Sequence, residues 1–201
     1  MKIIDNINET LRDDLKATIK TDTKVAIAAS YFSIYAFQEL KDQLTDIAEL
    51  RFIFTSPTFL TEKTKKERRE FDIPQLQRER SLYGTEYEIK LRNELTQKAI
   101  ARECAEWVRK KVVFKSNITD EHMGGFINVE NDAGCFTYQP VNGFTTVDIG
   151  CEKGNNAYNF VTKLDAPFSK QYLRTFDEIW NDETRLHDVT EEVIENISTV
   201  Y

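Results

Sequence analysis

The sequence has few histidines, cysteines and prolines and lacks any long apolar run. It contains two histidines, three cysteines and four prolines in 201 residues. The cysteines, Cys104, Cys135 and Cys151, are odd in number and irregular in spacing, so they predict reduced thiols and not a disulfide framework. No run of about 18 apolar residues and no signal-peptide pattern occurs. We therefore expect a cytoplasmic protein with no membrane partner.

Zinc-binding patterns are also missing. Nitrogen and sulfur ligands are available only at His122, Cys135 and Cys151, with His187 distant in the sequence. No Cys-x-x-Cys or His-x-x-x-His pair brings two ligands together at the spacing of a compact tetrahedral site. The sequence therefore predicts no metal site of this kind.

Patterns for a magnesium-dependent nuclease or a nucleotide loop are incomplete. Asp148, Glu152 and Lys153 could hold Mg²⁺ and activate water, but the Glu-x-Lys alternation of restriction-type nucleases is absent there. The segment 150–156 (GCEKGNN) is a weak match to a phosphate-binding loop, because it is short and carries an acidic residue. We expect no cofactor.

The net charge of -7 argues against a uniformly basic surface, but it conceals a basic segment. The run Lys63–Glu70 (KTKKERRE) has five basic residues and two acidic ones. Lysine and arginine neutralise nucleic-acid phosphates without reading the base sequence. A solvated charged helix or loop is the alternative interpretation. The predicted nucleic-acid-binding residues are Lys63, Lys65, Lys66, Arg68, Arg69, Arg78, Arg80, Lys110, Lys111 and Lys115.

The first third of the chain predicts a βαβ unit. Apolar residues three or four apart predict an amphipathic helix over residues 4–19, and the run 25–29 (VAIAA) predicts a strand covered on both faces. Ser33 is placed to cap a helix that precedes a second strand over residues 50–54. The two strands should be parallel, with a right-handed crossover.

The rest of the chain predicts a charged insertion followed by further strands and helices. Residues 58–110 form the charged helical insertion, whose long helix starts at a capping box of Thr85 and Glu88. Strand-like runs follow, which we expect to be antiparallel neighbours: Val112–Lys115, Phe126–Val129, Cys135–Tyr138, Phe144–Ile149 and, within residues 157–164, one more. Helices should begin near Pro167 and at Thr190. The whole predicts one α/β domain over residues 1–201, a mixed sheet flanked by helices.

The stretch from Val112 to Gly154 is the expected position of a site. It contains six of the seven glycines and one of the two histidines, His122. Its short strands and tight turns are typical of loops that bring polar side chains together at one edge of a sheet.

Several segments together resemble one protein family. They are the strand exit 29–33 (ASYFS), the segments 79–117, with its ARECAEWVRKK, and 142–150 (NGFTTVDIG), and the closing 176–182 (FDEIWND) and 188–197 (DVTEEVIENI). In this arrangement the chain resembles the phospholipase D-like domain at the N-terminus of bacterial Swi/Snf-type superfamily II helicases. The resemblance implies a parent protein that is an ATP-binding helicase and hydrolase. The predicted C-terminal helix, residues 188–201, would then lead into the helicase motor.

The resemblance also identifies a degenerate active site. Active members of that family carry His-x-Lys-x4-Asp, in which the histidine attacks phosphorus and the lysine binds phosphate oxygens. His122 matches the histidine, but Gly124 replaces the lysine and Val129 replaces the aspartate. Nothing at position 124 can then offset the charge that gathers on phosphate.

The resemblance implies a non-catalytic accessory domain that docks DNA, RNA or a protein partner for a helicase. Two alternatives stay open. One is a phosphodiesterase or nuclease that uses His122 in a dimeric site. The other is an oligomerisation module that forms a homodimer.

Overall fold

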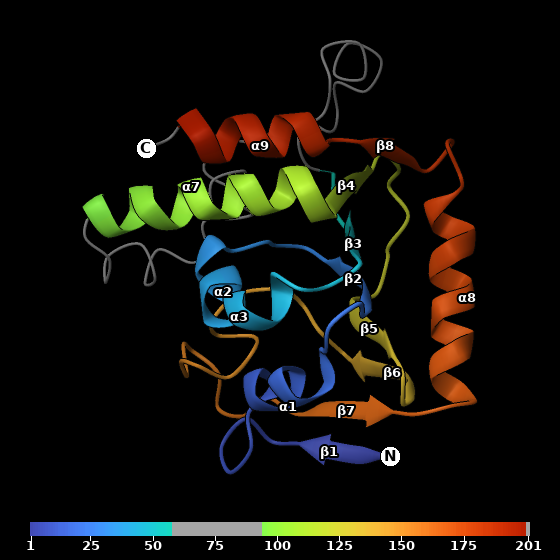
Figure 1. Cartoon of the computed structure of the whole chain (residues 1–201). Coiled ribbons are helices and arrows are strands. Elements are labelled where there is room, and N and C mark those ends of the chain that lie inside the picture. The colour runs from blue at the N-terminus through green and yellow to red at the C-terminus, as the bar shows by residue number, and fades with distance from the viewer. Residues whose placement is uncertain (58–93, 200–201) are drawn as a thin grey trace.

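A mixed β-sheet runs through the centre of the domain (Figure 1). The computed structural model describes residues 1–57 and 94–199. Within these residues the sheet has eight strands in the order β1-β7-β6-β5-β2-β3-β4-β8. Their bounds are β1 Lys2–Ile4, β2 Lys24–Ala29, β3 Glu49–Phe54, β4 Val112–Asn117, β5 Phe126–Asn131, β6 Gly134–Gln139, β7 Val161–Leu164 and β8 Leu186–Asp188. The predicted α/β class, a mixed sheet flanked by helices, is confirmed.

Helices cover the two faces of the sheet unequally (Figure 1). One face packs against α1 (Leu11–Thr18), α2 (Ile34–Glu39), α3 (Lys41–Leu44), α7 (Glu94–Lys111) and α9 (Thr190–Thr199), and the other against α8 (Phe168–Trp180). Val25 and Ile27 of β2 face the larger core, whereas Ala26 and Ala28 face α8. A strand buried on both faces explains the continuous apolar run that predicts it.

Strands β2, β3 and β4 are parallel to one another. The βαβ pattern in the sequence predicts this for β2 and β3. Val25 pairs with Leu50 between β2 and β3, and Leu50 pairs with Val112 between β3 and β4. Ser33 caps α2 by accepting hydrogen bonds from the backbone N–H groups of Tyr35 and Ala36. Because parallel strands end on the same side, the carboxyl ends of β2, β3 and β4 share one edge of the sheet.

An aromatic cluster lies beneath this shared edge. The ring of Phe32, just after β2, lies 5.7 Å from Phe52, 5.1 Å from Phe114 and 5.9 Å from Phe144, measured between centroids. Phe32 also forms an isolated parallel bridge with Phe144, so the chain after β6 runs along the continuation of β2. The cluster fixes the loops that form the edge.

The predicted N-terminal helix over residues 4–19 is wrong in its first half. Residues Lys2–Ile4 form strand β1, paired with β7, and α1 begins only at Leu11. Between them, the carboxylate of Asp5 accepts hydrogen bonds from the backbone N–H groups of Ile7 and Asn8. This local turn competes with a helix, and it leaves Ile7 72% exposed.

The predicted pairing of the central strands is partly wrong. β5 and β6 form the expected antiparallel hairpin, with Gly134 at positive φ in its turn. β4 is not their neighbour, because it pairs with β3 and, antiparallel, with β8. The run Phe144–Ile149 is a series of turns, in which the hydroxyl of Thr145 donates to the carboxylate of Asp148.

The predicted charged insertion over residues 58–110 is described only in part. Its residues 58–93, with the capping box at Thr85, lie outside the described residues. From Glu94 onward α7 continues the predicted long helix to Lys111, and α9 begins at the predicted Thr190. Among the described helices, none is long and apolar enough to cross a membrane.

The buried carboxylate of Asp14 joins α1 to strands β1, β6 and β7. Asp14 is 5% exposed, and it accepts a hydrogen bond from the hydroxyl of Tyr138 at 2.5 Å. The ammonium groups of Lys163 and Lys2 lie 2.9 and 3.0 Å from its two oxygens. Burial alone would raise the pKa of Asp14, but these hydrogen bonds outweigh it and lower the pKa to about 2.

We expect Asp14→Asn to lower the free energy of unfolding by about 2 to 4 kcal/mol at pH 7, because two lysines lose their counter-charge. The lowered pKa means that the carboxylate stabilises the fold above pH 3.8 and loses this effect as the pH falls toward about 2. The difference from the parent protein in urea unfolding should therefore shrink between pH 4 and 2. Asp13→Asn, on the exposed side of the same helix, is the control; equal losses in both variants would contradict the prediction.

Candidate functional site

The carboxyl ends of β2, β3 and β4 form the base of the candidate site. Just past β2 and β3, the hydroxyls of Ser30 and Thr55 lie 2.8 Å apart. Asn117, the last residue of β4, donates through its amide to the carbonyls of Thr55 and Glu121, at 2.9 and 3.0 Å. Its side-chain oxygen accepts from the backbone N–H and hydroxyl of Thr119. Asn117 therefore fixes the loop that leads from β4 to β5.

His122 lies on this loop and is exposed. Two residues later, a Cβ placed on Gly124 would meet no heavy atom within 4 Å. A Cβ on Gly125 would lie 1.8 Å from the carbonyl oxygen of Val141, to which Gly125 is also joined by a backbone hydrogen bond of 3.0 Å. Gly125 is thus required for close approach of two backbones, whereas Gly124 has room for a side chain.

A buried carboxylate lies in the neighbouring loop, after β6. Burial raises the pKa of Asp148 to about 6, although hydrogen bonds from the Thr145 hydroxyl and the Gly143 backbone N–H act in the opposite direction. A Cβ on Gly143 would meet the Asp148 carboxylate at 2.7 Å and the ring of Tyr31 at 3.1 Å. Asp148 therefore stabilises its own loop, which backbone hydrogen bonds from Ser30 to Asn142 and from Phe144 to Tyr31 hold against the end of β2.

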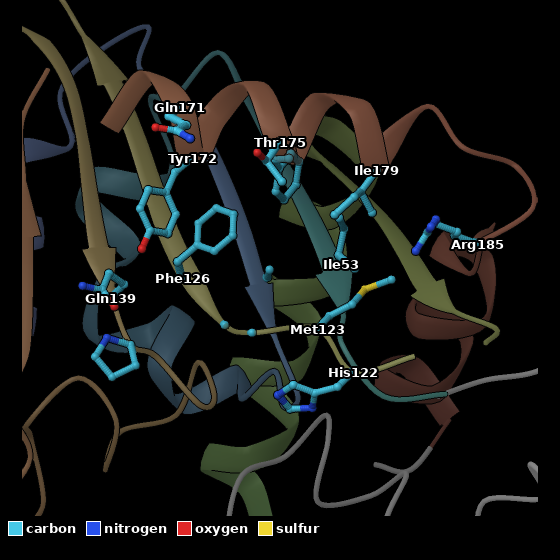
Figure 2. Close-up of a pocket in the computed structure, with 15 residues that line it drawn as sticks. Ile53, His122, Met123, Phe126, Gln139, Gln171, Tyr172, Thr175, Ile179 and Arg185 are labelled. Carbon is cyan, nitrogen blue, oxygen red and sulfur yellow. The ribbon is translucent and has the colours of Figure 1, made fainter. Parts of the chain in front are cut away.

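A cavity of about 640 Å³ opens beside His122, between α8 and the sheet (Figure 2). Its walls come from the ends of β2, β3 and β6, the β4–β5 loop, α8 and the approach to β8. They consist of Ala28, Ile53, His122, Met123, Gly124, Gly125, Phe126, Gln139, Pro140, Gln171, Tyr172, Thr175, Phe176, Ile179 and Arg185. The volume is in the range of small-molecule sites.

Contacts at both ends of α8 hold the helix over this cavity. At its start, the Ser169 hydroxyl donates to the carbonyl of Cys135 at 2.7 Å. Toward its end, the guanidinium of Arg51 lies 5.0 Å from the ring centroid of Phe176 and 2.8 Å from the carboxylate of Asp177. Lys115 donates to the carbonyl of Trp180. The middle of the helix spans the cavity and points side chains into it (Figure 2).

Three of the predicted phosphate-binding residues lie in the described part of the chain, and two of these three have partners inside the domain. The other seven, Lys63, Lys65, Lys66, Arg68, Arg69, Arg78 and Arg80, lie outside the described residues. Lys110 is exposed at the end of α7. Lys111 instead donates to the carbonyl of Ile47 at 2.8 Å, and Lys115 lies 4.5 Å from the ring centroid of Trp180. The ammonium groups of Lys111 and Lys115 thus already have partners within the domain.

The histidine, cysteine and acidic side chains weighed as metal ligands form no such site in the described structure. Cys104 and Cys135 are buried free thiols, and Cys151 is partly buried. Glu152 accepts a hydrogen bond from Thr146, so it is turned toward its own loop. Among residues 1–57 and 94–199 there is no group of three or more His, Cys, Asp or Glu side chains that could hold a metal ion.

Sequence reasoning found His122 and the glycines but missed the α8 wall of the cavity. Gln171 and Thr175 come from a helix about fifty residues away in the chain, and only the fold brings them over the sheet. The helical period of Tyr172, Phe176 and Ile179 is visible in the sequence, but it indicates a buried face equally well. No local signal distinguishes a helix that lines a cavity from one that packs closely.

The two adjacent glycines give a matched test of the loop geometry. We expect Gly125→Ala to lower the free energy of unfolding by at least about 3 kcal/mol, because its Cβ would overlap the Val141 carbonyl. Gly124→Ala should change it by less than about 1 kcal/mol, since the added Cβ enters open space. Urea unfolding of both variants checks this, and similar losses in the two would show that the loop lies elsewhere.

Comparison with known proteins does not assign the chain to a family. No protein-family model matches the chain, and no curated protein matches it significantly.

Proposed function

We propose that this chain is a non-catalytic, phospholipase D-like accessory domain that docks nucleic acid for a helicase. One observation carries the proposal. His122 and Gly124 lie two positions apart in the loop at the carboxyl edge of the central strands, and the space beside Gly124 is open. The family resemblance requires a lysine there, and the loop has room for one but carries none. The absence of this lysine supports a role in which the edge binds without cleaving phosphate.

The other cation at the cavity does not replace the missing lysine. Arg185 forms ion pairs with Glu121 and with Asp182, the latter at 3.0 Å. Two carboxylates therefore offset its charge before any phosphate approaches. Phosphoryl transfer depends on positive charge placed where negative charge develops, so binding without cleavage is the better-supported role.

The basic segment supplies the docking charge in this proposal. Lys65, Lys66, Arg68 and Arg69 form its densest part. Contacts of this kind neutralise phosphates and release counterions, so affinity falls steeply with salt and depends little on base sequence.

A filter-binding titration with a short DNA duplex, a DNA single strand and an RNA single strand tests the docking function. We expect dissociation constants on the order of micromolar or weaker at low salt. Changing Lys65, Lys66, Arg68 and Arg69 to glutamate should weaken binding at least about tenfold and reduce the salt slope by roughly 3 to 4. The control carries Lys16, Lys20, Lys153 and Lys170 changed to glutamate, the same loss of charge at exposed positions. Absence of binding at low salt would remove nucleic acid as the partner and favour protein docking.

A hydrolytic role for His122 in a dimer is the second candidate, favoured by the exposure of this side chain at the rim of the cavity. We expect no cleavage of bis(p-nitrophenyl) phosphate by the parent protein. The His122→Asn variant and the His187→Asn control should both give the same rate as the parent protein. Turnover that His122→Asn abolishes and His187→Asn retains would instead establish the nuclease. Sedimentation at several concentrations separates a monomeric docking domain from the dimer that the hydrolytic role and the oligomerisation module both require.

A further inference from the structure

The cavity under α8 has an apolar floor and an aromatic wall. Ala28 and Ile53, from neighbouring strands, form part of the floor and are buried. The rings of Phe126 and Tyr172 meet edge to face, with centroids 5.1 Å apart, and both remain partly exposed (Figure 2). Met123 lies farther along the cavity, toward Arg185. A thioether and aromatic rings are surfaces on which a flat ring packs well.

Polar side chains surround this apolar floor without partners of their own. The amides of Gln139 and Gln171 and the hydroxyl of Tyr172 make no hydrogen bond to the rest of the described structure. On the same face, by contrast, the buried amide of Asn128 donates to Thr137 at 2.8 Å. The amides of Gln139 and Gln171 and the hydroxyl of Tyr172 are therefore available to a ligand in the cavity.

Two glutamine amides restrict the class of ligand. An amide offers a donor and an acceptor side by side, which is the pattern that adenine and the other bases present along their edges. Gln139 and Gln171 approach the cavity from the end of β6 and from α8. The charges at the mouth are balanced, because Arg185 is paired with Glu121. A neutral ring with a hydrogen-bonding edge fits this lining better than a multiply charged group.

We propose that the cavity between α8 and the sheet binds a nucleobase, with the ring against Phe126 and Tyr172 and its edge toward Gln139 and Gln171. The base comes either from a free nucleoside or nucleotide or from an unstacked position of a single strand. The residues that line this cavity are different from the basic residues that the docking proposal uses. Neutral nucleosides carry no phosphate, so the basic segment does not contribute to their binding. Their binding therefore tests the cavity even if the docking proposal is wrong.

Saturation-transfer NMR with adenosine and uridine, followed by titration of the ¹⁵N-labelled protein, tests the cavity directly. Thr175 points into the cavity from α8 (Figure 2), and it is exposed, so Thr175→Trp fills the space with little risk to folding. Arg174→Trp adds the same side chain at the next exposed position, which does not line the cavity, and it is the matched control. We expect nucleoside binding that Thr175→Trp abolishes and Arg174→Trp retains.

Gln171→Ala gives an independent measure of the hydrogen-bonding edge. It removes one amide from an exposed helical position and should weaken adenosine binding about fivefold, the effect of one hydrogen bond of about 1 kcal/mol. Indole is the comparison probe, because it has a similar flat shape but a single donor. Its binding should be weaker than that of adenosine and unchanged in Gln171→Ala.

Three results would overturn the proposal. They are absence of nucleoside binding at millimolar concentration, binding that survives Thr175→Trp, and indole binding as tight as that of adenosine. A DNA single strand distinguishes the two sources of the base. If Thr175→Trp weakens binding of the strand together with that of adenosine, the base belongs to a strand. If it weakens only adenosine, the ligand is a free nucleoside or nucleotide.

Discussion

The packing of Phe32 is the contact on which the arrangement of the site depends. This ring lies at the centre of the aromatic cluster and touches Phe52, Phe114 and Phe144, from two parallel strands and the loop after β6. Backbone hydrogen bonds then join the same segments, for example from Phe144 to the Tyr31 carbonyl at 2.8 Å. Aromatic burial and main-chain pairing thus reinforce each other, and they set the positions of the loops without using any side chain that could bind a ligand.

Different physical features build the edge and the cavity. At the edge, backbones approach so closely at Gly125 that no side chain fits, and the adjacent Gly124 leaves open space. Under α8, large side chains meet with their rings only partly covered, and amides line the opening. In the proposed docking role, the charge for phosphate comes from the basic segment and not from the lining of the cavity.

Sequence patterns predicted the elements that neighbouring residues determine. They failed where contacts with distant segments determine the structure. The apolar run of β2 and the Ser33 cap are visible in the sequence and appear as expected. Ile7 continued a helical period, but hydrogen bonds to Asp5 form a turn instead. The partners of β4 come from residues about sixty positions before it and seventy after, so nearness in the sequence gave the wrong neighbours. His122 could be named as a candidate from the sequence, whereas the position of Gln171 at the same cavity depends on the fold.

The unequal burial on the two faces of the sheet has a consequence for the dynamics of α8. Within the described residues, the core on its side contains five buried apolar residues, Ala26, Ala28, Ile53, Phe176 and Leu186, and the opposite core is several times larger. Segments with little buried apolar surface open at lower free energy than the rest of a domain. We therefore expect α8 to separate from the sheet at a lower free energy than the helices of the larger core, while the parallel strands stay intact beneath it. Any molecule held in the cavity bridges helix and sheet, so it would slow amide hydrogen exchange in α8 before it changed global stability.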